Sequence, residues 1–178
     1  MNVKSSLQSK VKEIVLISLY ASLICVFTIL IPQIVISGIP FTLQTLIIIT
    51  IANIAKPRVT FLSVLLYLAI GIIGLPVFSG LKGGLGVILG PTGGFLIAFP
   101  FASLFISKLI KQKFLYNILI NIIFGILFIY LLGVSQFSIV NEITFLKGLK
   151  GMLLFIPIDT VKIIIATLIG IRVKKTIN

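Results

Sequence analysis

Two ionisable residues, Asp159 and Lys162, stand three positions apart in an otherwise apolar stretch near the end of the chain. Residues with this spacing share one face of a helix, so the acid and the amine can interact. A charge at the centre of a membrane helix costs about 2.5–3.5 kcal/mol and is tolerated where it pairs or meets a ligand. An ammonium suits a ligand carboxylate, and a carboxylate accepts from paired N–H donors such as those of a urea ring. The alternative is a structural ion pair that stabilises the last helix.

The glycine-rich stretch 83–94 is the second candidate for chemistry. Glycine tolerates unusual backbone angles and lacks a side chain, so a ligand can approach the main chain closely. The stretch lacks the Gly-x-x-x-x-Gly-Lys-Ser/Thr pattern of a phosphate-binding loop, and Lys82 beside it is expected to be solvated. A plain connector with tight turns is the alternative. The ligand contacts that we predict here are Gly83, Gly84, Gly86, Thr92 and Gly93.

Four further residues are candidate ligand contacts. They are polar or aromatic residues within or beside apolar segments, where a ligand can supply a hydrogen-bond or stacking partner. The amide of Gln44 needs a partner in hydrocarbon, which is either a ligand or another helix. Tyr67 lies in the middle of an apolar segment, where it stacks on a ligand or fills the core. Phe78 and Ser79 stand at the edge of the glycine-rich stretch and are predicted to wall a pocket.

The composition places these residues in a membrane. The chain has 178 residues, of which 59% are hydrophobic and 10% charged, whereas a soluble domain is about a quarter charged. Apolar runs recur that are long enough to cross a bilayer core of about 30 Å. We therefore predict an all-α, polytopic membrane protein that forms one integral domain over residues 1–178. Its six transmembrane helices are expected in a single bundle, at about 14–36, 41–55, 59–78, 91–110, 114–134 and 151–171, with a more polar stretch at 135–150.

The distribution of basic residues predicts the orientation. The formal net charge is +12, and positive charges favour cytoplasmic loops. If both termini are cytoplasmic, eleven basic residues lie inside and three outside, with Lys162 inside a helix. The inside set is Lys4, Lys10, Lys12, Lys56, Arg58, Lys108, Lys111, Lys113, Arg172, Lys174 and Lys175, and the outside set is Lys82, Lys147 and Lys150. The net charge is thus explained without a nucleic-acid partner. In this orientation the polar groups at 41–45, 91–94 and 159–162 share the outer half of the membrane.

Other function classes find little support. The chain has no histidine and one cysteine, so we expect no metal site, no cofactor and no intramolecular disulfide. No paired carboxylates or activated nucleophile are present, so we expect no enzyme activity.

Small residues recur at four-residue spacing, which permits close helix packing. Gly94, Ala98 and Ala102 are predicted to serve packing within the chain. The first segment has two more such pairs, for which packing and docking against another membrane subunit are both open. These predicted docking residues are Ser18, Ala21, Ser22 and Cys25.

Several motifs together resemble the BioY family, the biotin-specific S components of energy-coupling factor (ECF) transporters. The resemblance spans about residues 14–169, and its most specific parts are the glycine-rich stretch and the Asp-x-x-Lys of the last segment. The motifs are Pro40-Phe41-Thr42-Leu43-Gln44-Thr45, Leu65-Leu66-Tyr67-Leu68, Gly74-Leu75-Pro76-Val77-Phe78, Gly83-Gly84-Leu85-Gly86, Gly90-Pro91-Thr92-Gly93-Gly94-Phe95 and Pro157-Ile158-Asp159-Thr160-Val161-Lys162. One departure is that Ser18, Ser22 and Cys25 stand where related chains usually carry alanine.

The resemblance implies a six-helix protein of the cell membrane that binds biotin from the extracellular side. It would join a transmembrane coupling protein and two cytoplasmic ATPases that supply the energy for uptake. Asp159 and Lys162 would lie in the pocket, with Tyr67 and the glycine-rich backbone nearby. Biotin has two ureido N–H groups and a carboxylate, so our hypothesis assigns Asp159 to the ring and Lys162 to the tail. The alternatives are an S component for another vitamin, a lone ion-coupled carrier and a membrane scaffold protein.

Overall fold

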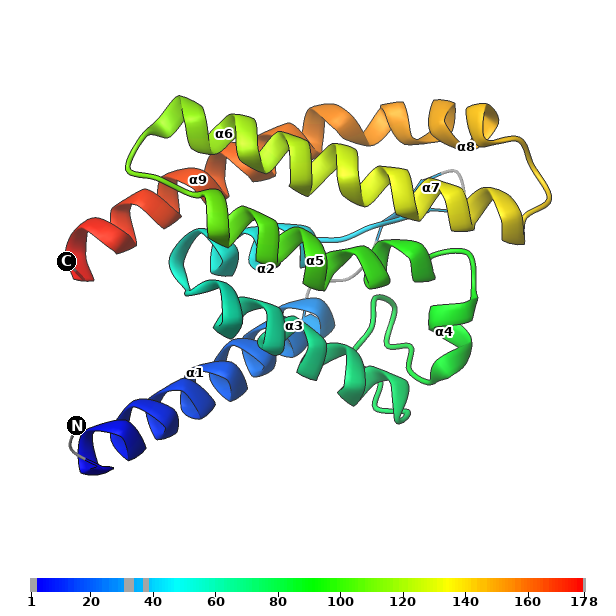
Figure 1. Cartoon of the computed structure of the whole chain (residues 1–178). Helices are drawn as coiled ribbons and strands as arrows, with labels where there is room; N and C mark the ends of the chain where they lie inside the picture. The colour runs from blue at the N-terminus through cyan, green and yellow to red at the C-terminus, as the bar shows by residue number, and fades with distance from the viewer. Residues whose placement is uncertain (1–2, 31–33, 37–38, 178) are drawn as a thin grey trace.

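The computed structural model describes residues 3–30, 34–36 and 39–177 of the chain, and helices dominate this part (Figure 1). A short antiparallel hairpin joins the first two helices, with Ile34 opposite Phe41. The elements in chain order are α1 (Val3–Leu30), β1 (Ile34–Ile36), β2 (Ile39–Phe41), α2 (Gln44–Ile54), α3 (Pro57–Ile72), α4 (Leu85–Leu89), α5 (Gly93–Leu109), α6 (Phe114–Ile122), the π-helix η1 (Ile123–Phe128), α7 (Ile129–Val140), α8 (Phe145–Met152), the 3₁₀ turn η2 (Leu153–Phe155) and α9 (Ile156–Ile177).

The helices are those of a polytopic membrane protein, as the composition predicts. Three are long and apolar enough to cross a bilayer, namely Leu7–Leu30, Phe114–Val140 and Phe145–Thr176. The shorter apolar helices are Gln44–Ile54, Pro57–Ile72 and Gly93–Leu109. At about 1.5 Å per residue, these three are shorter than the hydrocarbon core of about 30 Å. The number of crossings therefore stays a prediction.

Helix α5 is at the centre of the bundle, where it packs against α2, α3 and α7 (Figure 1). Helix α1 packs along α3, and α9 packs along α2 and α6. The predicted packing role of the small residues on α5 is confirmed, because Ala98 and Ala102 are buried and a Cβ on Gly94 would collide with the carbonyl oxygen of Leu132. These residues let α7 approach the central helix closely.

Two predicted boundaries near the amino terminus are wrong. The first segment is not helical to residue 36, because α1 ends at Leu30 and β1 occupies Ile34–Ile36; residues 31–33 and 37–38 lie outside the described part. The second helix begins at Gln44 instead of 41, because β2 extends to Phe41. Runs of isoleucine and valine fit a strand as well as a membrane helix, and pairing within the hairpin decides between them.

The third segment and the glycine-rich stretch also differ from prediction. Helix α3 ends at Ile72, and Gly74 follows with a φ of 110°, a left-handed conformation that suits glycine. Residues to 78 are therefore a loop and not helix. Within the glycine-rich stretch, the short helix α4 covers Leu85–Leu89.

The polar stretch 135–150, which was placed outside the predicted transmembrane helices, is largely helical. The helix that begins at Phe114 extends to Val140 instead of 134, and α8 precedes the last helix. Ser135 and Gln136 find hydrogen-bond partners without breaking the helix. Ser135 donates to the carbonyl of Leu131, and the Gln136 amide donates to the carbonyls of Ile88 and Gly90 at 2.7 and 2.8 Å.

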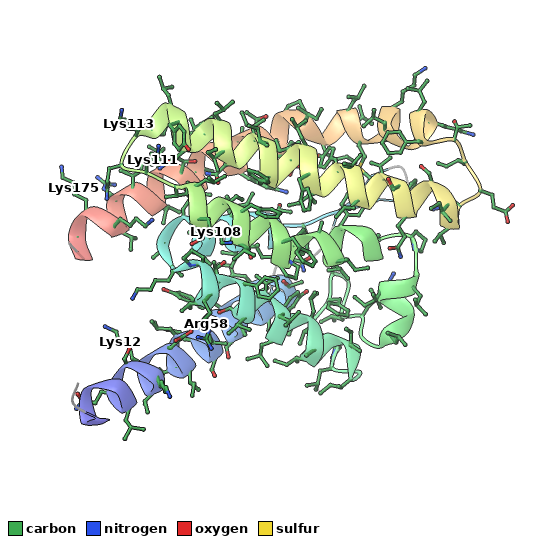
Figure 2. All side chains as sticks on the ribbon, viewed as in Figure 1. Lys12, Arg58, Lys108, Lys111, Lys113 and Lys175 are labelled. Carbon is green, nitrogen blue, oxygen red and sulfur yellow. The ribbon has the colours of Figure 1, made fainter. Side chains whose placement is uncertain are left out.

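Basic side chains gather at one end of the bundle. Figure 2 shows Lys12, Arg58, Lys108, Lys111, Lys113 and Lys175 at the end that carries both termini. Helices α4 and α8 lie at the opposite end (Figure 1). Near the basic end, Arg58 and Glu13 form an ion pair, with 3.1 Å between Nε of Arg58 and Oε1 of Glu13. The helix bundle is thus strongly asymmetric in charge along its length.

Candidate functional site: a cavity at the ends of five helical segments

A cavity of about 290 Å³ lies near the starts of α2, α5 and α9. This volume is near the lower end of the range for small-molecule pockets, about 300–1,000 Å³. Segments α4, η1, α7, α8 and η2 and the loop after α3 complete the wall. The lining residues are Thr42, Gln44, Thr45, Phe78, Ser79, Lys82, Val87, Pro91, Thr92, Phe95, Leu96, Phe99, Gly125, Ile129, Tyr130, Met152, Phe155, Asp159 and Lys162.

The three polar clusters that the sequence placed at one depth meet in this cavity. Thr42, Gln44 and Thr45 come from the start of α2, Pro91 and Thr92 from the turn before α5, and Asp159 and Lys162 from α9. Their convergence is confirmed by the structure. It follows from the direction of the helices, since α2, α5 and α9 all run from the side of α4 and α8 towards the end that carries the termini (Figure 1).

The ion pair between Asp159 and Lys162 forms the charged part of the cavity wall. The Lys162 ammonium donates to Oδ1 of Asp159 at 2.8 Å, and the two side chains are only 7% (Lys162) and 15% (Asp159) exposed. The i,i+3 spacing on one helix makes this contact local, as the sequence predicts. Taking two charges out of water is unfavourable unless each gains further hydrogen bonds, so their remaining partners decide whether the pair is tolerated.

Lys162 gains these bonds from the start of α2. Its ammonium also donates to the carbonyl oxygen of Thr42 at 2.7 Å and to Oγ1 of Thr45 at 3.3 Å. A lysine ammonium has three N–H donors, and Asp159, Thr42 and Thr45 all accept from it. Lys162 therefore ties α9 to α2 and holds one oxygen of Asp159 in place.

The other oxygen of Asp159 accepts a hydrogen bond from the hydroxyl of Tyr130 on α7. Tyr130 is held in turn by an edge-to-face contact with Phe95, whose ring centroid is 6.4 Å away. Each carboxylate oxygen has two lone-pair sites, so Asp159, which lines the cavity, keeps acceptor capacity after both contacts. The acid is thus oriented by a cation and a hydroxyl and can still accept from a ligand.

A second layer of polar contacts supports the opposite wall. Gln44 donates through Nε2 to the hydroxyl of Tyr67 at 2.7 Å, and Tyr67 donates to the carbonyl of Val77 at 3.2 Å. The Tyr67 ring packs edge-to-face on Phe78, with centroids 5.6 Å apart. Gly71 makes room for this, because a Cβ there would collide with the Phe78 ring. Tyr67 itself does not line the cavity; it positions Gln44 and Phe78, which do.

The glycines chiefly allow backbone segments to approach each other. A Cβ on Gly83 would collide with the carbonyls of Gly74 and Leu75, and one on Gly93 would collide with the carbonyl of Ile88. Gly84 adopts a φ of 94° at the start of α4. None of Gly83, Gly84, Gly86 and Gly93 is among the described residues that line the cavity. The predicted ligand contact of these glycines is therefore not supported by their placement.

Of the eleven predicted ligand contacts, the structure brings six to the cavity wall: Asp159, Lys162, Gln44, Phe78, Ser79 and Thr92. Their contact with a ligand stays a prediction. Sequence reasoning missed Tyr130, Lys82 and the apolar wall of Phe95, Phe99 and Phe155. A signal existed for Tyr130, since a tyrosine deep in an apolar segment needs a hydrogen-bond partner. No signal in the sequence distinguished the wall phenylalanines from the chain's other phenylalanines.

The predicted docking residues on α1 do not share one environment. Ala21 is buried at 1% exposure, and Cys25 is half-buried against the core between α1 and α3. Ser18 and Ser22 are exposed. The structure therefore assigns Ala21 to packing within the chain. A docking role stays a prediction for the exposed serines.

A family model and individual relatives point to the same protein family. The model of the BioY family matches residues 1–178. A probable biotin transporter BioY of Pyrococcus horikoshii is 38% identical, with 93% of this chain and 98% of the relative covered. The biotin transporter BioY2 of Lactococcus lactis subsp. cremoris is 36% identical, with 96% and 94% covered.

A solved structure has the same fold. The crystal structure of the S-component for biotin from an ECF-type ABC transporter superposes with a TM-score of 0.89 at 30% sequence identity. The superposition covers 94% of this chain and 93% of that one. The match over the whole length, together with the relatives above, shows that the chain belongs to the BioY family.

Proposed function

We propose that this chain is the substrate-binding S component of an ECF-type importer and that its cavity binds biotin. The observation that carries the proposal is the Asp159 carboxylate. It is oriented by Lys162 and Tyr130 and retains acceptor sites beside an aromatic wall. The relatives named biotin transporter and the fold of the biotin S-component support the same assignment. The function belongs to transport and not to enzyme catalysis, in keeping with the transporter family.

The chemistry of biotin fits the two kinds of wall. Its ureido ring presents N–H groups that a carboxylate accepts well, and charge-assisted hydrogen bonds of this kind are about twice as strong as neutral ones. The apolar faces of its fused rings suit Phe95, Phe99 and Phe155. We therefore place the ureido group at Asp159 and the ring system against the phenylalanines.

The asymmetry of charge supports an orientation with both termini in the cytoplasm of the cell. The basic residues in Figure 2 lie at the end that carries the termini, and the cavity lies towards the other end. Positive residues favour the cytoplasmic side, so the cavity faces the exterior and receives biotin there. Six crossings of the cell membrane are consistent with this arrangement if the shorter helices tilt little and the bilayer thins locally.

The partners follow from the proposed class. An S component works with a transmembrane coupling protein and two cytoplasmic ATPases, which supply the energy for transport. The exposed small residues Ser18 and Ser22 on α1 are the proposed docking points for the coupling protein. The chain's own contribution is capture of the vitamin, so binding does not require ATP.

Isothermal titration of the detergent-solubilised protein tests the proposal. We expect biotin to bind with one site per chain, and thiamine and riboflavin not to bind. Binding of either of those vitamins in place of biotin would assign the chain to another substrate. In vesicles that also contain the coupling protein and ATPases, uptake should depend on ATP. Uptake by this chain alone in response to a proton gradient would instead indicate an ion-coupled carrier.

A further inference from the structure

Two cations line the cavity among the residues that the structure describes, and their environments differ. Lys162 is 5% exposed, and Asp159, Thr42 and Thr45 accept from its ammonium. Lys82 is exposed, and within the described part of the chain its ammonium has no hydrogen-bond or ion-pair partner. Of these two lysines, Lys82 is therefore the better candidate to donate to an incoming anion.

The backbone holds Lys82 at the cavity wall. Phe78 donates its N–H to the carbonyl of Lys82 at 2.9 Å, and Lys82 donates its N–H to the carbonyl of Phe78 at 3.3 Å. The turn between them is tight, with positive φ values of 76° at Gly80 and 56° at Leu81. Because Phe78 is 1% exposed and fixed by Tyr67, this bridge fixes the position of Lys82 as well. A mobile loop would lose more freedom on binding than this closed turn does.

The two parts of the cavity wall thus offer different hydrogen-bonding groups. The buried part of the cavity carries the Asp159–Lys162 ion pair, and the exposed residue Lys82 is part of its wall. Biotin is polar in the complementary sense, with N–H donors at one end and a carboxylate at the other. A ligand in this orientation leaves the Lys162 contacts intact, whereas a carboxylate at Lys162 would displace Thr42, Thr45 or Asp159 from a buried ammonium. Leaving such buried groups without partners is unfavourable.

We propose that Lys82 binds the carboxylate of the ligand, and that Lys162 is a positioning residue that orients Asp159. This inference rests on the proposed function of the cavity and revises the sequence-based assignment of Lys162 to the tail. It makes Lys82 a determinant of specificity for the acid form of the vitamin over neutral derivatives.

The test combines a variant with a change of ligand. Biotin and its neutral carboxamide, biotinamide, are titrated into the wild-type chain and into Lys82→Met, which keeps an unbranched side chain of similar length and removes its charge. We expect Lys82→Met to bind biotin roughly tenfold more weakly, the size of a charge-assisted hydrogen bond. Biotinamide should bind both proteins equally, and Lys82→Arg should restore most of the affinity for biotin.

Two further variants separate the explanations. Lys147→Met removes an exposed charge from α8, outside the cavity wall, and should leave biotin affinity unchanged if long-range attraction is unimportant. Lys162→Met should weaken biotin and biotinamide by the same factor, because it disturbs Asp159 and not the tail. Thermal unfolding of each variant checks that the fold is intact.

The outcomes test the role of Lys82 separately from the proposed function. The proposal for Lys82 is overturned if Lys82→Met leaves biotin affinity unchanged or weakens biotin and biotinamide equally. It is also overturned if Lys162→Met, and not Lys82→Met, removes the preference for biotin over biotinamide. In each case biotin binding by the wild-type chain upholds the proposed function. If the wild-type chain does not bind biotin, both proposals fail together.

Discussion

Two buried polar clusters share helix α9, but only the first of them borders the cavity. The first contains Asp159, Lys162 and Tyr130. The second lies further along the helices and contains Asn53 on α2, Asn121 on α6 and Thr167 on α9, all at 1% exposure or less. The cavity wall includes none of the three residues of this second cluster.

The asparagine cluster satisfies itself. Asn53 and Asn121 exchange hydrogen bonds between their amides at 3.3 and 3.2 Å, and Asn121 also donates to Thr167 at 2.9 Å. Gly170 allows the helices to approach, because a Cβ there would collide with Asn53. Neutral groups that pair with each other hold helices together and leave nothing for a ligand.

The cluster of Asp159, Lys162 and Tyr130 differs from the asparagine cluster because it is charged and because its hydrogen-bonding capacity is not fully used. Lys162 and Tyr130 fix the Asp159 carboxylate, but its lone pairs exceed these contacts. The comparison teaches that burial of polar groups in a membrane bundle does not by itself indicate a binding site. Unused hydrogen-bonding capacity next to a cavity does, and the following variants test this distinction.

The largest effect is expected from Asp159→Asn. The amide keeps the shape of the side chain but removes the charge that accepts from Lys162 and from the ligand. We expect biotin affinity to fall about 100-fold, or about 2.7 kcal/mol, since the group loses charge-assisted bonds. Isothermal titration measures this. A change of less than about threefold would show that Asp159 is a structural residue.

A smaller loss is expected from Tyr130→Phe. Removal of the hydroxyl frees Oδ2 of Asp159 without creating a large void, so the acid loses one of its two orienting contacts. We expect biotin to bind roughly tenfold more weakly, with little change in thermal stability. Tyr116→Phe, on the half-buried Tyr116 outside the cavity, is the matched control and should not alter binding. Equal losses in both variants would contradict the role of Tyr130.

Asn121→Leu tests the other cluster and should show the opposite pattern. It leaves Asn53 and Thr167 each without one partner in the core, and we expect the free energy of unfolding to fall by about 1–2 kcal/mol. Biotin affinity should stay within about twofold, because the cavity wall is unaltered. Thermal unfolding and titration of the same samples measure the two quantities. The exposed Asn141→Ala is the control for stability. A large loss of affinity would show that the two clusters are coupled.

The smallest change in free energy is expected from Tyr67→Phe, and it concerns binding. The ring contact with Phe78 remains, while the Gln44 amide loses its acceptor and the Val77 carbonyl loses a donor. Because Tyr67 acts through Gln44, we expect a two- to fivefold loss of biotin affinity, or about 0.4–1 kcal/mol. Gln44→Leu should mask this effect, so that the double variant binds like Gln44→Leu alone. Additive losses would indicate that Tyr67 contacts the ligand directly.

The class of fold and the pairing within α9 were predictable from sequence. Membrane insertion depends on composition and segment length, and the contact of Asp159 with Lys162 depends on local spacing. The glycine-rich stretch contributes Val87, Pro91 and Thr92 to the cavity wall. Ligand contact by its glycines stays a prediction, because a glycine that approaches a ligand and one that approaches another backbone look alike in sequence.

Only the tertiary structure decided the partners of the acid. Asn121 and Tyr130 both contact α9, although nine residues span about 2.5 turns of a regular α-helix and would place them on opposite faces. The π-helix η1 (Ile123–Phe128) lies between them and its wider turns bring both towards α9. Nothing in the run from Ile123 to Phe128 signals this change of helical phase. Likewise, Lys162 reaches Thr42 across 120 positions of sequence because α2 packs on α9. Local spacing therefore determined which residues are charged neighbours, and helix packing determined which of their hydrogen-bonding sites remain open.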